Sequence, residues 1–204
     1  MKREVILSLI VAGVTGQAGQ HPEEQRPQTL QELVACLEGD ANASVAARAQ
    51  SLAAKMFAGI GVKLEWHTYH ACPMGPEQPV IISLVQPTSP NLKPGALAYA
   101  EPYEGTNISV FYDRVQKTVD SQTVPFLLAH VLVHEIAHIV EGSDQHADTG
   151  VMKRRWDRND FFQMAQGPLA FTEEDLQLLR NGREARTHRQ PRRTGWTRVA
   201  WLEN

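Results

Sequence analysis

The chain has 204 residues, a net charge of −3 and 42% hydrophobic residues. These values suit one domain with an adequate hydrophobic core and do not favour two domains. The ordinary balance of charges gives no reason to expect nucleic acid or a membrane surface as a partner.

Residues 1–20 have the pattern of a secretory signal peptide. Lys2 and Arg3 form a short basic start, residues 5–14 form an apolar run, and small residues near the end of the segment offer cleavage sites. The apolar run is too short to span a bilayer. We therefore expect export, with a secreted or periplasmic location.

Two helices are predicted at the start of the mature chain. Thr29 is placed to cap a short helix that ends at Gly39, with apolar residues at helical spacing. Residues 43–57 are rich in alanine, carry apolar residues at the same spacing and are followed by Gly59. We interpret both helices as scaffold.

Four strands are predicted next. Residues 62–67 alternate between apolar and polar side chains, which is the period of a half-buried strand. Residues 80–85 form a continuous apolar run that suits a central strand. Residues 95–102 end in a proline and are predicted to form an edge strand, followed after a turn by a strand at 108–115.

The two cysteines of the chain are Cys36 and Cys72. In an exported protein an even pair of cysteines can form one disulfide. The sequence alone does not determine whether these two residues meet.

Residues 126–140 are apolar on every side of a helical projection, which predicts a helix buried in the domain interior. The exceptions are His130, His134, Glu135 and His138. Burying imidazoles and a carboxylate costs desolvation energy unless a metal ion or a partner group satisfies them. We therefore expect a zinc site on this helix.

The order His-Glu-x-x-His supplies the geometry of a zinc site. His134 and His138 are four residues apart and lie on one face of the helix, so both can bind one ion. Glu135 lies toward the same side, where it can take a proton from a zinc-bound water as the general base. Gly142 can end the helix and turn the chain back, so that His146 can supply a third ligand.

These residues resemble the metzincin clan of zinc peptidases, whose motif HExxHxxGxxH is followed by a methionine-containing turn. The matching residues are His134, Glu135, His138, Gly142, His146 and Met152. In the usual pattern the glycine lies three residues after the second histidine and the third ligand three after the glycine, whereas this chain has four and four. We select His146 as the third ligand, and Asp144, at the usual offset, is the alternative.

His130 lies one helical turn before His134. A ligand at that position would be too far along the helix axis to share the same tetrahedral site. We expect His130 to be an interior histidine whose polar atoms are satisfied by the protein.

The resemblance also implies roles outside the motif. In metzincins the edge strand over the cleft pairs with extended substrate, and this role would fall on residues 95–102. Tyr99 or Tyr103 would then line the cleft or assist the developing oxyanion, and packing on the sheet is the alternative for each. Some metzincin propeptides hold the zinc with a cysteine, but Cys72 lies after the domain has begun, where a removable propeptide would not lie.

The C-terminal part is predicted to be short. The basic run at 153–158 suits a solvated loop, and recognition of acidic side chains is the alternative. Thr172 to Asp175 form a capping-box start to a final helix that we expect to end near Gly182.

The elements together predict an α/β fold. It has N-terminal helices, a twisted mixed sheet of about four or five strands over a zinc-binding active-site helix, and a small C-terminal subdomain. The expected organisation is a signal peptide at 1–20, a metzincin-like zinc peptidase domain at 21–182 and a basic tail at 183–204.

The predicted function is zinc-dependent hydrolysis of peptide bonds by an exported metallopeptidase. His134, His138 and His146 would hold Zn²⁺, and Glu135 would act as general base. We expect a peptide or protein substrate, neither nucleic acid nor membrane as a partner, and a monomer. The alternatives are an exported zinc- and peptide-binding protein without catalysis, and a zinc amidase that acts on cell-wall peptides.

Overall fold

The computed structural model describes residues 31–73 and 78–188. Its elements are β1 (Gln31–Glu38), α1 (Ala43–Ala58), β2 (Val62–Thr68), the 3-10 helix η1 (Tyr69–Ala71), β3 (Val80–Val85), β4 (Ala98–Ala100), β5 (Asn107–Phe111), α2 (Tyr112–Thr118), α3 (Val124–Glu141), α4 (Arg158–Gln166) and α5 (Glu173–His188). The predicted α/β class is confirmed. The predicted signal peptide lies outside the described residues.

The five strands form one mixed sheet in the order β2-β1-β3-β5-β4. The neighbours along β2, β1, β3 and β5 are parallel, and β4 runs antiparallel to β5 at the edge. The strands predicted at 62–67 and 80–85 are confirmed, and β3 is the central strand. The edge strand predicted within 95–102 is β4, which covers only Ala98–Ala100.

The helix predicted between Thr29 and Gly39 is wrong, because residues 31–38 form β1. This strand pairs on both sides, with β2 and with β3. A parallel strand inside a sheet carries apolar residues on both faces, so its sequence lacks alternation and can match helical spacing by chance. Hydrogen bonds to two neighbouring strands then outweigh the local pattern.

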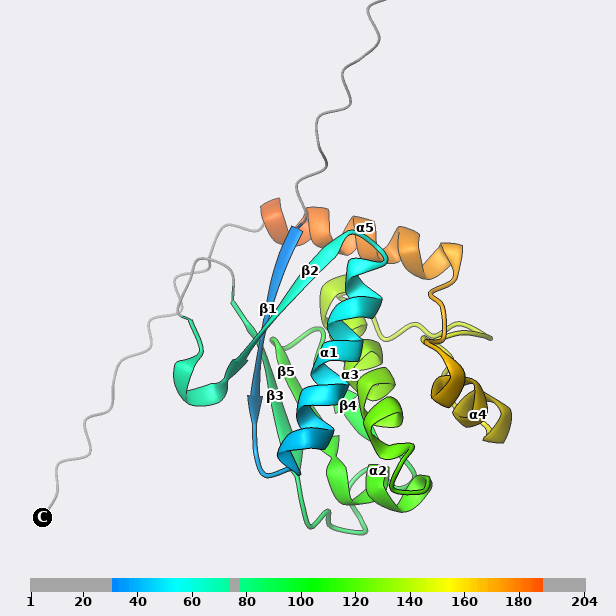
Figure 1. Ribbon diagram of the computed structural model, residues 1–204. Helices are drawn as coiled ribbons and strands as arrows, with labels where there is room; N and C mark the ends of the chain where they lie inside the picture. The colour runs from blue at the N-terminus through cyan, green and yellow to red at the C-terminus, as the bar shows by residue number, and fades with distance from the viewer. Residues whose placement is uncertain (1–30, 74–77, 189–204) are drawn as a thin grey trace, which may run out of the picture.

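Helices α1 and α3 lie side by side against one face of the sheet (Figure 1). Val80, Ile82 and Leu84 alternate along β3 as its buried residues and belong to the same core as both helices. Helix α3 is buried on nearly every side, as predicted. It is the one described helix that is long and apolar enough to cross a membrane, and most of it is buried inside the protein.

The strand predicted at 108–115 ends earlier than expected. β5 stops at Phe111, and α2 begins at Tyr112 without an intervening loop. Tyr112 and Val115 are buried on α2, so this short helix continues the core that the strand begins.

Helix α4 was not predicted. Asp157 caps it through a capping box with Asp160, whose side chain accepts a hydrogen bond from the Asp157 amide at 2.8 Å. Lys153 pairs with both carboxylates, so part of the basic run at 153–158 is neutralised rather than freely solvated. The sequence signal was the Asp-x-x-Asp spacing.

Helix α5 begins with the predicted capping box but continues to His188, past the predicted end near Gly182. A Cβ atom at Gly182 would lie 2.2 Å from the carbonyl oxygen of Val140 and 2.6 Å from the Cα of Glu141. The glycine therefore permits α5 to pack closely on the end of α3, and it does not terminate the helix.

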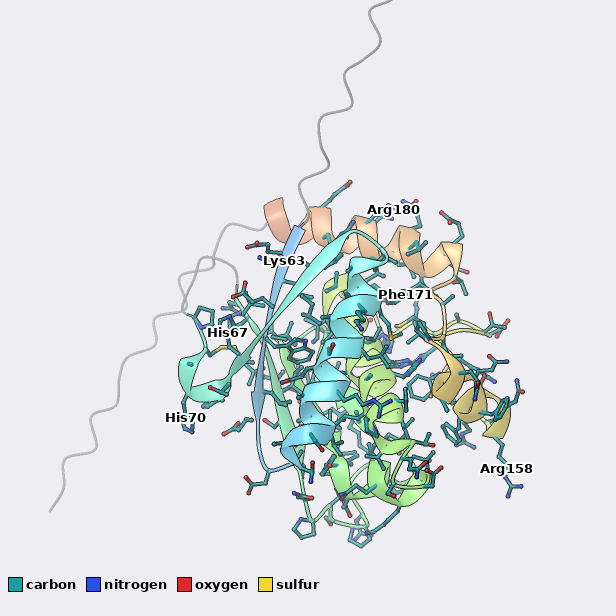
Figure 2. All side chains as sticks on the ribbon, viewed as in Figure 1. Lys63, His67, His70, Arg158, Phe171 and Arg180 are labelled. Atoms are coloured by element: carbon teal, nitrogen blue, oxygen red, sulfur yellow. A yellow bond between two sulfur atoms is a disulfide. The ribbon has the colours of Figure 1, made fainter. Side chains whose placement is uncertain are left out.

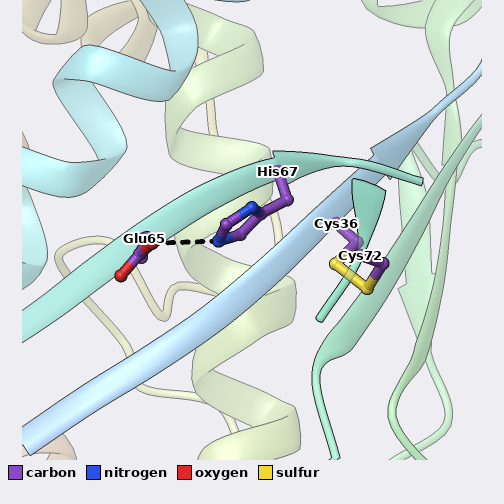
Figure 3. The surroundings of a disulfide bond; sticks show 4 residues. All are labelled: Cys36, Glu65, His67 and Cys72. Carbon is purple, nitrogen blue, oxygen red and sulfur yellow. Dashed lines mark hydrogen bonds and ion pairs between the residues drawn. A yellow bond between two sulfur atoms is a disulfide. The ribbon is translucent and has the colours of Figure 1, made fainter. Parts of the chain in front are cut away.

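Cys36 and Cys72 form a disulfide that joins β1 to the segment after η1 (Figure 3). Beside it, Nε2 of His67 lies 3.0 Å from Oε1 of Glu65. Figure 2 places His67 and His70 on the opposite side of the molecule from Arg158 of α4. Because Cys72 is in a disulfide, it is not available as a zinc-holding thiol.

Candidate metal centre

Helix α3 carries His134, Glu135 and His138 into the interior, where their side chains are 7%, 8% and 5% exposed. The helix is apolar around these residues, so the sheet and the other helices cover it on nearly all sides. The i to i+4 spacing places the two imidazoles on one helical face. Their ring centroids are 4.7 Å apart.

The chain turns at Gly142, whose φ of +65° is left-handed. A glycine that ends the helix was predicted at this position. Its amide donates to the carbonyl of His138 at 3.0 Å. The following segment returns toward the helix and brings His146 to the two helical histidines, with ring centroids 5.2 Å from His134 and 4.8 Å from His138. One ligand atom from each of the three histidines lies within 4.8 Å of the others.

Two backbone carbonyls fix the tautomers of the helical histidines. Nδ1 of His134 donates to the carbonyl of Val151 at 2.8 Å, and Nδ1 of His138 donates to the carbonyl of Ser143 at 2.9 Å. A carbonyl only accepts, so the proton of each ring is on Nδ1. Burial lowers the pKa of His134 to about 3 and the pKa of His138 to about 4, so both rings are neutral at neutral pH.

The two Nε2 atoms therefore face each other as bare acceptors, 3.1 Å apart. Neither can donate to the other, and two lone pairs at this distance repel. A cation between them turns the repulsion into two bonds, and two ligands about 2.0–2.1 Å from one zinc ion are separated by a similar distance. The donor set of three imidazoles, with the Nδ1 atoms held by carbonyls, fits a zinc ion.

Residues 150–152 form a turn that holds His134 through the carbonyl of Val151. The φ of Gly150 is +75°, and a Cβ atom there would lie 2.3 Å from the carbonyl oxygen of Ala170. The amide of Val151 donates to the same carbonyl at 3.0 Å. The carbonyl of Val151 accepts from His134. Met152 is buried, and its carbonyl accepts from the amide of Ala147 at 3.0 Å, so the turn also holds the segment that carries His146.

Glu135 lies on the side of α3 that faces the edge strand. The backbone of Ala100 in β4 lies near its carboxyl. Burial raises the pKa of Glu135 to about 8, while the Ala100 amide and the charge of Lys93 act in the opposite direction. The carboxyl is thus buried, close to the edge strand and adjacent in sequence to a candidate metal ligand.

His130 lies outside the three-histidine group, as predicted. Its Nδ1 donates to the carbonyl of Phe126 at 2.7 Å, and its Nε2 accepts from the amide of Leu169 at 3.0 Å. Both ring nitrogens are therefore used by the protein. The indole of Trp156 packs edge-on against both His130 and His134 and fixes the orientation of the rings.

Asp144, the alternative third ligand, does not belong to the three-histidine group. Its Oδ1 accepts a hydrogen bond of 2.9 Å from the hydroxyl of Tyr103, which is 70% exposed. The turn at Gly142 thus brings His146, four residues later, to His138, and it does not bring Asp144, two residues later, into the group. Tyr99 packs against Phe111, as the packing alternative predicted.

Several groups that shape the site were not found from the sequence. The carbonyls of Val151 and Ser143 and the amide of Ala100 belong to the backbone, so no residue type marks them. Trp156 could be recognised only as an apolar residue beyond the motif. Lys93 lies in a loop about thirty residues before α3, and the sequence gives no sign that its charge acts on Glu135.

No protein family and no curated protein matched the sequence. The fold is similar to the crystal structure of an archaemetzincin from Methanopyrus kandleri, with 15% identity over 78% of this chain and 99% of that chain and a TM-score of 0.48. It is also similar to the structure of myroilysin, with 15% identity over 72% of this chain and 66% of that chain and a TM-score of 0.35.

Proposed function

We propose that the protein is a zinc-dependent peptidase. The observation that carries the proposal is the convergence of three neutral imidazoles on one point beside a buried carboxyl group. A zinc ion held by His134, His138 and His146 would polarise a peptide carbonyl, acidify a water molecule and favour the carboxylate form of Glu135 through its charge.

Glu135 would move the proton. It would take the proton of the attacking water and pass it to the leaving amine, the usual role of a carboxylate beside such a site. Glu135 is buried on α3 beside the candidate ligands, so the packing around it restricts where the proton acceptor can point. The apolar surroundings limit access of bulk water to this proton.

The edge strand would bind the substrate backbone. The carbonyl of Leu97 and the amide of Glu101 bond to β5, so by antiparallel alternation the polar groups of Ala98 and Ala100 face away from β5. Because β4 is the edge strand, the polar groups on this free edge are available to an extended peptide. This arrangement supports a peptide rather than a compact small molecule as substrate.

The test is a comparison of two glutamate variants of α3. Glu135→Gln should keep stoichiometric zinc and lose hydrolysis by about 10²–10⁴-fold. Glu141→Gln removes another carboxyl from the same helix, outside the three-histidine group, and should hydrolyse at the parental rate. Equal hydrolysis by Glu135→Gln and the parent would rule out the proposed base.

The same assay separates the alternatives. Zinc-loaded protein that binds peptides from a proteome-derived library without cutting any of them would be a binding protein. Cleavage of cell-wall peptides but not of unfolded proteins would indicate an amidase.

We also propose that the protein is exported. The disulfide between Cys36 and Cys72 supports this, because such bonds persist in oxidising compartments. Fractionation of the producing cell, followed by N-terminal sequencing of the mature chain, tests the location and the cleavage within residues 1–20. Recovery of the uncleaved, reduced chain from the cytoplasm would contradict export.

A further inference from the structure

The loop between β3 and β4 is held in one shape by a single arginine. Arg114 of α2 packs its guanidinium 4.4 Å from the ring centroid of Phe111 and points its nitrogens into the loop. Its two terminal nitrogens donate to four loop carbonyls, those of Ser89, Leu92, Lys93 and Ala96, at 3.1, 2.6, 2.8 and 2.9 Å. Four hydrogen bonds from one planar guanidinium group hold the loop backbone in a single conformation.

This clamp holds Lys93 in a backbone conformation that lysine rarely adopts. Its φ is +41°, in the left-handed region that costs of order 1–3 kcal/mol for a side chain other than glycine. Its carbonyl accepts both from Arg114 and from the amide of Ala96, at 3.1 Å. Such conformations persist where the surrounding structure imposes them, and they are concentrated at functional sites.

The side chain of Lys93 is directed onto the edge strand. Its Nζ lies 4.4 Å from the ring centroid of Tyr99 in β4. The residue is exposed, and within the described chain its ammonium has no carboxylate partner. The ring restrains the ammonium without neutralising its charge.

This position is on β4, the edge strand of the sheet, which helix α3 contacts. Tyr99 lies in β4 between Ala98 and Ala100, the two residues whose backbone polar groups face away from β5. A substrate lying along the free edge of β4 would therefore pass close to the ammonium.

We propose that the ammonium of Lys93 binds a carboxylate of the substrate. The inference rests on the proposed function and narrows its substrate class to peptides with a negative charge in the segment that lies along β4. Two sources supply this chemistry, the free C-terminal carboxylate of a short peptide and the side chain of an aspartate or glutamate. A restrained ammonium without an anionic partner loses little freedom when such a group binds, so most of the attraction is retained as affinity.

The experiment measures binding separately from hydrolysis. Zinc-loaded Glu135→Gln protein is titrated into fluorescent hexapeptides, and binding is followed by anisotropy at low and high salt. One arm compares a free C-terminus with its amide, and the other compares glutamate with glutamine at each position. Because the binding measurement needs no turnover, it reports on Lys93 whether or not the wild-type protein cleaves the same peptides.

We expect the carboxylate form in one arm to bind about 5–20-fold more tightly than its neutral counterpart, and the preference to shrink at high salt. Adding Lys93→Met should remove this preference and leave the neutral peptides unaffected, while Lys93→Arg should retain it. Lys55→Met, in the exposed last turn of α1, makes the same charge change as a matched control and should have no effect.

Equal binding of charged and neutral peptides in both arms would overturn the proposal, as would a preference that survives Lys93→Met. An equal loss for all peptides in Lys93→Met would also overturn it, because Lys93 would then only shape the loop. If charged peptides bind more tightly than neutral ones but the wild-type protein cleaves none of them, the proposed peptidase activity is refuted. The role of Lys93 in binding would then still stand.

Discussion

Nε2 of His134 and Nε2 of His138 lie 3.1 Å apart, and both are acceptors. The cause lies outside the helix, because the carbonyls of Val151 and Ser143 hold the protons on the opposite nitrogens. Two acceptors at this separation fit the coordination of one divalent cation. This relationship, more than the motif itself, distinguishes a prepared metal site from two histidines on a buried helix.

The third ligand is the first prediction. His146→Ala should lower zinc affinity by more than the roughly 10–100-fold cost of losing an outer partner of a ligand. Asp144→Asn should keep zinc, because that side chain bonds Tyr103 instead. Zinc content after dialysis and competition with a chromogenic chelator measure both. A variant at Asp144 that loses zinc while His146→Ala retains it would reverse the assignment.

The second prediction concerns Glu141. Both of its carboxyl oxygens are buried and have no hydrogen-bond partner among the residues that the structure describes. Burial, followed by the charge of Asp175, raises its pKa to about 8. A raised pKa means that the folded state holds the proton more tightly than the unfolded state, whose carboxyl titrates near 4.5. The contribution of Glu141 to the free energy of unfolding is therefore present below about pH 4.5 and is lost as pH rises toward about 8.

Glu141→Gln should remove this pH dependence. The stability of the variant relative to the parent should improve steadily between pH 5 and pH 8, as measured by urea unfolding at each pH. Glu38→Gln, at an exposed position in β1, is the control and should show no such trend. A constant difference between Glu141→Gln and the parent across this range would argue against a buried, proton-retaining carboxyl.

Gly182 gives the third prediction. In an unobstructed helix, replacing glycine with alanine stabilises by about 0.5–1 kcal/mol. Here the new methyl group would meet the backbone of Val140 and Glu141, so Gly182→Ala should destabilise by about 1–3 kcal/mol. Thermal unfolding measures the sign. Gly167→Ala, where no atom lies within 4 Å of the added Cβ, should be close to neutral.

The fourth prediction concerns the disulfide, which links residues separated by 36 positions. Loop-closure entropy for such a loop predicts that replacing Cys36 and Cys72 together with alanine costs about 3–4 kcal/mol. Zinc content at a temperature where the variant is folded should be unchanged, because the bond lies in the sheet on the side of β1 and β2 (Figure 3). Chemical unfolding gives the first quantity and metal analysis the second; unaltered stability would contradict the expected effect.

The fold was predicted best where burial and periodicity agree. The alternation along β2, the apolar run of β3 and the apolar circumference of α3 each identified their element. The prediction failed for β1, because a strand paired on both sides loses its alternation and its spacing then matched a helix. It also failed at Gly182, where a residue that commonly ends helices instead allows two helices to touch.

For the site, the sequence by itself determined which groups can bind a metal, because the spacing of His134, Glu135 and His138 along a helix fixes their relative directions. It also determined that the helix is buried, since no face of it is polar. The tertiary structure decided which downstream residue joins them and which ring nitrogens carry the protons. It also decided which lysine ammonium lies beside the edge strand. These outcomes depend on backbone carbonyls and on contacts between residues far apart in the chain. Neither can be recognised from the order of the side chains.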